Sequence, residues 1–298
     1  MRQSKKLLAK VRPDAVFIKG GFVGVPVGKA CAKLGIPYIT HDSDTVPGLA
    51  NRLIAKNAFL HTVGMPKEFY EYPPEKTEVV GIPIASDYEA VTSQLMQQYR
   101  SNLKLPSDSQ IVFVTGGSLG ASRLNMYMTM VMPELLQKNP KLFVIHQVGK
   151  GNLGLYGGLS SDLQSRVQVS EFINDMQIYS GAADVVVSRA GASTIAELAL
   201  QGKPTILIPN PFLTSGHQLT NAQRLSESGA VEVLHEETLN KDPQALGIAI
   251  TALLNDRETR TKLTKQLMTF AHPQAAQRLA TLILESIEYV HEKQKQKA

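Results

Sequence analysis

Residues 111–121, IVFVTGGSLGA, decide the fold of this chain. Their first four residues are apolar and predict a buried strand, glycines then turn the chain, and a helical stretch follows. Glycine lets a backbone approach a ligand closely, and a helix N-terminus presents free N–H groups and the positive end of its dipole to an anion. Ser118 would add a hydroxyl donor for a phosphate. No Gly-Lys-Ser/Thr follows, so this is not a P-loop; a plain strand-to-helix turn is the alternative.

A second stretch, residues 183–197 (ADVVVSRAGASTIAE), repeats the pattern of strand, short loop and helix. Ser193 is predicted to be the N-cap of that helix. Glu197 lies four residues later and therefore faces the same side. A carboxylate there can accept both hydroxyls of a ribose. A capping arrangement of Ser193 and Glu197, worth about 1 kcal/mol, explains the pair equally well.

Two further loops follow predicted strands. Residues 209–222 contain His217, Gln218 and Asn221 at the start of a predicted helix, and amides hydrogen-bond sugar hydroxyls well. Residues 171–176 contain Phe172 and Ile173, which could pack on a flat base. For both loops, ordinary capping or core packing is the alternative.

Short β-rich runs alternate with helical stretches along the chain, which predicts α/β structure with parallel sheets. The 298 residues suit two doubly wound domains, and we place them at 1–104 and 105–298. A helix is predicted over 88–103. The first domain opens late, on a basic helix leading to a strand at Ala15, so we expect it to be incomplete. An upstream start or a separate N-terminal half would supply the rest.

The composition restricts the class of protein. The single cysteine, Cys31, cannot form an internal disulfide and indicates a reducing compartment. The net charge of +5 suits a phosphate-rich ligand or an anionic membrane surface. No nucleic-acid motif accompanies it, and no apolar run is long enough to cross a membrane. Any membrane contact should be peripheral, with candidates at Lys56, Phe59, Lys67, Phe69 and Tyr70.

The first half carries polar residues where predicted strands end. Gly20 and Gly21 follow one strand, and His41, Asp42 and Asp44 follow the next. If the two domains oppose each other, these loops face the cleft. A general base that takes a proton from an acceptor hydroxyl is the favoured role for this group. Three neighbouring residues rarely complete a metal site, so no metal is expected.

Taken together, these segments resemble the N-acetylglucosaminyltransferases of peptidoglycan synthesis in glycosyltransferase family 28. The matching segments run in order over nearly the whole chain: 12–28, 34–41, 48–52, 79–83, 116–125, 146–151, 171–176, 183–197 and 216–222. The resemblance implies a GT-B fold, two Rossmann-like domains facing a cleft. It implies transfer of N-acetylglucosamine from UDP-N-acetylglucosamine to lipid I, giving lipid II, with inversion and without cofactor or metal. It also implies a cytoplasmic enzyme, peripheral on the inner face of the cell membrane.

The resemblance assigns residues as well. Ser118 would hold donor phosphate, Phe172 and Ile173 uracil, Glu197 the ribose, and Gln218 with Asn221 the sugar. The diphosphate and the helix behind it would involve Ala192, Ser193, Thr194, Ile195 and Ala196. It places Asp44 and Asn51 on the acceptor side or near the transferred sugar. Gly20 and Gly21 join them there by their place after a strand, and His41 and Asp44 are the catalytic candidates.

Three departures from the family pattern matter. Nothing here matches the family's first glycine-rich loop. Asp44 stands where the family often has Asn, and Ala85 where it has Arg; Arg189 and Lys150 are the candidates to replace that lost charge. Two alternatives to an active transferase follow: a UDP-sugar-binding protein without turnover, and another GT-B enzyme such as a glycolipid synthase or UDP-sugar epimerase.

Overall fold

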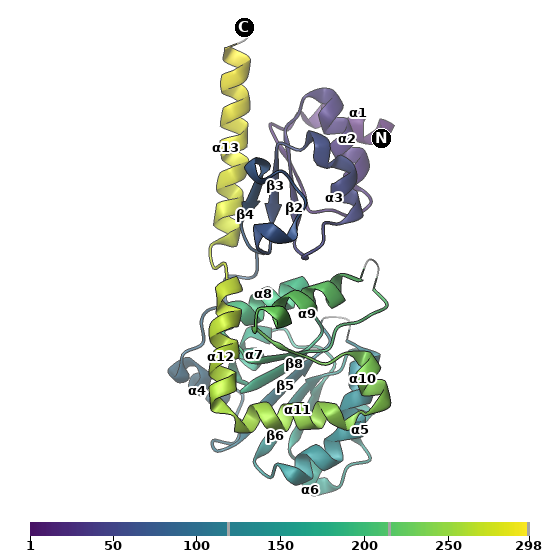
Figure 1. Ribbon diagram of the computed structural model, residues 1–298, viewed down its shortest axis with the longest axis vertical. Coiled ribbons are helices and arrows are strands. Elements are labelled where there is room, and N and C mark those ends of the chain that lie inside the picture. The colour runs from purple at the N-terminus through teal and green to yellow at the C-terminus, as the bar shows by residue number, and fades with distance from the viewer. Residues whose placement is uncertain (118–119, 214–215, 297–298) are drawn as a thin grey trace. The chain divides into compact units, whose positions relative to one another are not determined.

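The computed structural model describes residues 1–117, 120–213 and 216–296, which form two compact units (Figure 1). Unit 1 comprises Met1–Ile84 and His272–Ala298, and unit 2 comprises Ala85–Ala271. Both are built on parallel sheets, as predicted. The boundaries differ from those expected. Residues 85–104 join unit 2, where the Arg100 guanidinium forms an ion pair with Asp184 at 2.8 Å, and the C-terminal helix joins unit 1.

Unit 1 contains a four-stranded sheet in the order β1-β2-β3-β4. Its strands are β1 (Val16–Ile18), β2 (Tyr38–Asp42), β3 (Leu60–Val63) and β4 (Thr77–Val79). Its helices are α1 (Arg2–Val11), α2 (Gly24–Leu34), α3 (Leu49–Ile54) and α13 (Ala275–Lys295), with 3₁₀ turns η1 (Ala55–Asn57), η2 (Lys67–Phe69) and η3 (Pro74–Lys76). Cys31 is a fully buried member of this unit's core.

Helix α13 covers the edge of this sheet at β4. Arg278 on α13 donates to Glu78 on β4 at 3.1 Å, and the Tyr289 ring lies 5.5 Å from the Phe59 ring. Leu279 and Leu282 are buried on the same helix. A covered edge strand offers no free row of backbone groups for pairing with another chain.

Unit 2 contains a six-stranded sheet in the order β10-β9-β8-β5-β6-β7. Its strands are β5 (Gln110–Thr115), β6 (Leu142–Gln147), β7 (Val167–Ser170), β8 (Val185–Ser188), β9 (Thr205–Leu207) and β10 (Glu232–Val233). Its helices are α4 (Ser93–Asn102), α5 (Ser122–Lys138), α6 (Ser161–Gln164), α7 (Met176–Ala182), α8 (Ala192–Gln201), α9 (His217–Glu227), α10 (Glu236–Lys241), α11 (Gln244–Asn255) and α12 (Arg257–Leu267), with 3₁₀ turns η4 (Leu153–Tyr156) and η6 (Met268–Phe270).

Helix α4 is shorter than the helix predicted over 88–103. It begins at Ser93 because the Thr92 hydroxyl accepts from the Leu95 amide at 3.1 Å and caps it there. The residues before Thr92 run as irregular chain beside α8, where the Val91 amide donates to the Gln201 carbonyl at 3.3 Å. This placement brings Tyr88 to the candidate site.

Candidate functional site

The strand order of unit 2 creates a crevice beside β5 and β8. From β5 the chain runs outward through β6 and β7, then returns to β8 on the other side of β5 and continues to β9 and β10. The loops that follow the neighbouring strands β5 and β8 therefore lead toward opposite edges of the sheet. Open parallel sheets bind ligands at such a reversal of strand order. Helices α5 and α8 both begin here, which brings the two sequence motifs together as predicted.

The start of α8 is open to an anion. The helix begins at Ala192 with Gly191 as its N-cap, so the prediction that Ser193 caps it is wrong. Gly191 has no side chain to offer, and the first helical bond runs from the Ile195 amide to the Gly191 carbonyl. The amides of residues 192–194 thus have no partner within the helix. Ile195 itself is buried and packs into the core.

The glycine loop after β5 requires its glycines. Gly117 and Gly120 have φ angles of 81° and 73°, the left-handed region that glycine adopts without strain. A Cβ on Gly120 would lie 2.8 Å from the Val148 carbonyl. The Gln147 amide donates to the Gly117 carbonyl at 3.1 Å and fixes the loop. Ser118 lies outside the described residues, so its phosphate role stays a prediction.

Glu197 lies on α8, on the turn after these amides. Burial raises its pKa to about 7, and the hydrogen bond from Tyr88 opposes that rise. Asp87 adds a smaller repulsion. Tyr88 was not predicted as a site residue, because residue 88 was expected to open a helix. It reaches Glu197 because α4 begins only at Ser93 and the irregular chain before Thr92 runs beside α8.

The two residues predicted to bind the base behave differently. The Phe172 side chain is 57% exposed, so its ring is available for stacking. Ile173 is buried, so its side chain packs in the interior and is not exposed for contact with a base. The same loop is held by the Glu171 carboxylate, which accepts from the Gly151 amide at 2.6 Å.

The two amides on α9 also differ. Gln218 accepts from the Asn210 amide at 2.9 Å through its Oε1, which leaves its Nε2 to donate elsewhere. Asn221 is fully buried and donates to the Ala190 carbonyl at 3.2 Å. Asn221 therefore ties α9 to the loop after β8, and its geometry suits positioning better than contact with a sugar.

Arg189 does not replace the positive charge lost at Ala85. Its guanidinium donates to the Ile208 carbonyl at 2.9 Å and pairs with Glu236 at 2.7 Å. Glu236, only 2% exposed, also pairs with Arg123 at 2.8 Å. The Arg123 guanidinium in turn lies 5.0 Å from the Phe212 ring centre. The expectation for Arg189 is therefore wrong, because this network holds it in the interior.

In unit 1, the polar residues that end β2 form one hydrogen-bonded group. Asn51 on α3 donates to the His41 carbonyl at 3.0 Å and to the Asp42 carboxylate at 2.9 Å. Its Oδ1 is buried and has no partner among the described residues. A Cβ on Gly20 would lie 3.9 Å from this amide. Gly20 and Asn51, both predicted on the acceptor side, are thus neighbours, with Gly21 next in the loop.

The two residues predicted as catalytic are not equivalent. His41 is 1% exposed, and its Nδ1 hydrogen-bonds the Thr62 hydroxyl at 3.1 Å. Burial lowers its pKa to about 4, so the ring is neutral near pH 7. Asp44 is half-buried in the loop that follows, and its carbonyl accepts from the Tyr70 hydroxyl at 2.9 Å. Of the two, Asp44 has the better access to a ligand.

The described residues contain neither a candidate metal site nor a candidate membrane span. No group of three His, Cys, Asp or Glu side chains there could hold a metal ion. No described helix is both long enough and apolar enough to span a bilayer.

Known proteins match the chain over almost its whole length. The Glycosyltransferase family 28 C-terminal domain matches residues 111–279, and the family's N-terminal domain matches residues 1–59. A relative from Natranaerobius thermophilus, the UDP-N-acetylglucosamine--N-acetylmuramyl-(pentapeptide) pyrophosphoryl-undecaprenol N-acetylglucosamine transferase, is 32% identical over 96% of this chain and 77% of its own length. The crystal structure of Acinetobacter baumannii MurG covers 95% of this chain and 76% of its own, with 27% identity and a TM-score of 0.75. The Neisseria meningitidis UDP-GlcNAc 2-epimerase bound to UDP-GlcNAc, at 15% identity and a TM-score of 0.65 over 95% of this chain and 80% of its own, shares the fold alone.

Proposed function

The chain belongs to glycosyltransferase family 28, and on that ground we propose that it transfers N-acetylglucosamine from UDP-N-acetylglucosamine to a lipid-linked N-acetylmuramyl-peptide, as its curated relatives are named to do. One observation carries the proposal. Helix α8 begins at the strand-order reversal without a side-chain cap, and the half-buried carboxylate of Glu197 lies on its next turn. Free amides suit a diphosphate, and a carboxylate beside them suits the ribose.

The donor would bind in unit 2. The amides of residues 192–194 take the diphosphate, Glu197 accepts the ribose hydroxyls, and the exposed Phe172 ring stacks on uracil. Gln218 reads the sugar through its Nε2, while Asn221 fixes the loop that carries the diphosphate site. Ser118 and Lys150 are the remaining candidates for phosphate contact.

The acceptor would bind to unit 1, at Gly20, Gly21 and Asn51. In the reaction, the acceptor hydroxyl attacks the anomeric carbon of the donor sugar, and UDP leaves with the electrons of the broken C–O bond. Asp44 takes the proton of the attacking hydroxyl as general base. His41 supports this centre as a neutral residue that holds β2 to β3. The amides around the diphosphate stabilise the charge that develops on UDP.

A second function, binding of a UDP-sugar without turnover, is favoured by one observation. Residue 85 is Ala, and Arg189 is directed to Glu236, so two sources of positive charge are withdrawn from the proposed diphosphate site.

Membrane contact of the peripheral kind also belongs to this proposal. Among the candidates from sequence, Tyr70 is buried and Phe59 packs on Tyr289, which leaves them unsuited to it. Phe22 and Leu53 fit better, at 88% and 55% exposure in the loop before α2 and on the α3 surface. Sedimentation with anionic phospholipid vesicles tests this: Phe22→Ser together with Leu53→Ser should lower the bound fraction, and an unchanged fraction would exclude this surface.

The function is tested by adding UDP-N-acetylglucosamine and a lipid-linked N-acetylmuramyl-pentapeptide to the chain. Formation of the disaccharide product together with an equal amount of UDP supports a transferase. Saturable binding of UDP-N-acetylglucosamine in calorimetry with no product supports the binding protein. Asp44→Ala should abolish product while leaving donor binding unchanged.

A further inference from the structure

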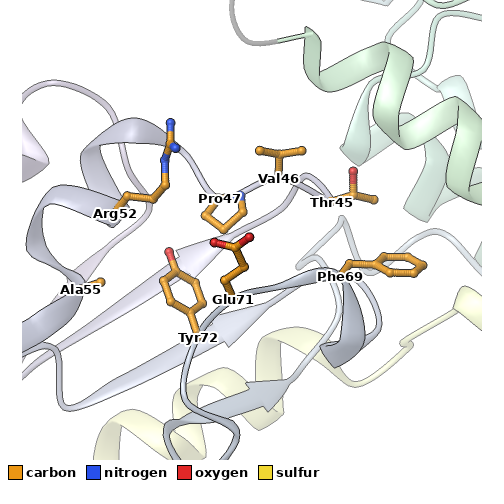
Figure 2. A pocket seen from close by; sticks show the side chains of 8 residues that line it. All are labelled: Thr45, Val46, Pro47, Arg52, Ala55, Phe69, Glu71 and Tyr72. Carbon is orange, nitrogen blue, oxygen red and sulfur yellow. The ribbon is translucent and has the colours of Figure 1, made fainter.

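Unit 1 contains a pocket that the assignments above leave unused. It has a volume of about 370 Å³ and is lined by the loop after β2, by α3 and the start of η1, and by the end of η2 with the residues that follow it (Figure 2). Pockets of this size hold small organic groups. The lining residues are Thr45, Val46, Pro47, Arg52, Ala55, Phe69, Glu71 and Tyr72.

Two opposite charges line this pocket without being paired. Arg52 and Glu71 form no ion pair with any residue that the structure describes, although both are exposed at its mouth. Figure 2 shows Arg52 on the α3 side, and Glu71 rising beside Tyr72 from the facing segment. Arginine binds carboxylates through two parallel hydrogen bonds. Together the two charges suit a ligand that carries both a carboxylate and an ammonium group.

The base of the pocket is fixed. The Tyr72 ring stacks on His61 with centres 3.9 Å apart, and its hydroxyl donates to the Asp42 carboxylate at 2.9 Å. The other oxygen of Asp42 accepts from Asn51 at 2.9 Å and from the Gly48 amide at 2.9 Å. Two hydrogen bonds therefore connect the pocket wall to Asn51. The pocket adjoins the proposed acceptor site and does not need to form when a ligand arrives.

Apolar surface completes the lining. Val46 and Pro47 form one wall and Phe69 another, as Figure 2 shows. A short peptide combines aliphatic groups with both charges. The curated relatives are named for an acceptor that carries a pentapeptide on its N-acetylmuramyl sugar. We propose that this pocket binds the peptide of the acceptor, with Arg52 on a carboxylate and Glu71 on an ammonium group. This inference rests on the proposed function.

The test compares two lipid-linked N-acetylmuramyl acceptors, one with the pentapeptide and one shortened to its first residue. Arg52→Gln and Glu71→Gln should each raise the KM for the pentapeptide acceptor about tenfold, with kcat and the KM for the short acceptor unchanged. The matched controls, Lys33→Gln and Glu75→Gln, remove exposed charges of the same sign in unit 1 away from the pocket. Equal effects on both acceptors, or no effect on either, would overturn the proposal.

A second measurement separates this inference from the proposed function. The free pentapeptide is titrated into each protein and followed by NMR, which needs no turnover. Saturable shifts in the wild type that are lost in Arg52→Gln support the pocket even if no product forms. No binding to the wild type, or equal binding to the variant, rejects the pocket even if the chain is an active transferase. Circular dichroism confirms that each variant is folded.

Discussion

Binding of UDP-N-acetylglucosamine should depend on pH through one carboxyl group. Burial raises the pKa of Glu197 to about 7, and only its ionised form can accept hydrogen bonds from both ribose hydroxyls. With that pKa the carboxyl is about 90% ionised at pH 8 and about 9% at pH 6. The association constant for UDP-N-acetylglucosamine should therefore fall about tenfold from pH 8 to pH 6. This is a loss of about 1.4 kcal/mol in binding free energy.

The raised pKa of Glu197 also affects the free energy of unfolding, which depends on pH in the opposite direction to donor binding. The folded pKa lies above the ordinary value of 4.5, so the protonated carboxyl favours the folded state. That contribution is complete below pH 4.5 and is lost as the pH rises through 7. The free protein should thus lose stability over the range in which donor binding gains strength.

Calorimetric titration with UDP-N-acetylglucosamine between pH 6 and 8 measures the effect. The sugar nucleotide is preferable to UDP because the terminal phosphate of UDP titrates near about pH 6. Glu197→Gln is the control, since it keeps the shape of the side chain and removes its titration. Any slope left in that variant belongs to other groups. A flat wild-type profile, or the same slope in both proteins, would refute the ribose assignment.

Three further predictions concern neighbouring features. Tyr88→Phe removes the hydrogen bond that lowers the pKa of Glu197, so the midpoint of the binding profile should move to higher pH, and an unmoved midpoint would exclude that contact. Glu236→Ala leaves a buried guanidinium unpaired and should cost about 3 kcal/mol in urea unfolding; a loss below 1 kcal/mol would show that the pair adds little. Gly81→Ala places a Cβ 2.1 Å from the His272 side chain at a φ of 78°, so the melting temperature should fall, and an equal melting temperature would contradict the packing there.

The features that were predicted correctly are local in sequence. Apolar runs followed by glycines fixed the places where β5 and β8 end, and strand-to-helix turns of that kind need only neighbouring residues. Parallel sheets followed from the alternation of strands and helices. The position of Glu197 on α8 came from helical spacing alone.

The features that were missed depend on residues far apart in the chain. Arg189 was expected near a phosphate, yet its partner Glu236 is reached only when α10 packs beside the end of β8. Tyr88 meets Glu197 because Thr92 starts α4 late. Ser193 favours capping by propensity, but the turn after β8 places Gly191 at that position. Sequence patterns that span only a few residues cannot predict contacts between residues so far apart in the chain.

The division of unit 1 along the chain has a consequence for its synthesis. A ribosome makes residues 1–84 before unit 2, but it makes helix α13, which covers the edge of β4, only after unit 2. Unit 2, made in one continuous stretch, can complete its sheet while unit 1 still has an open edge strand. Residues 1–84 therefore reach their final fold only after unit 2 has been made. A chain cut short before residue 272 would carry a finished second unit beside a first unit with an exposed edge.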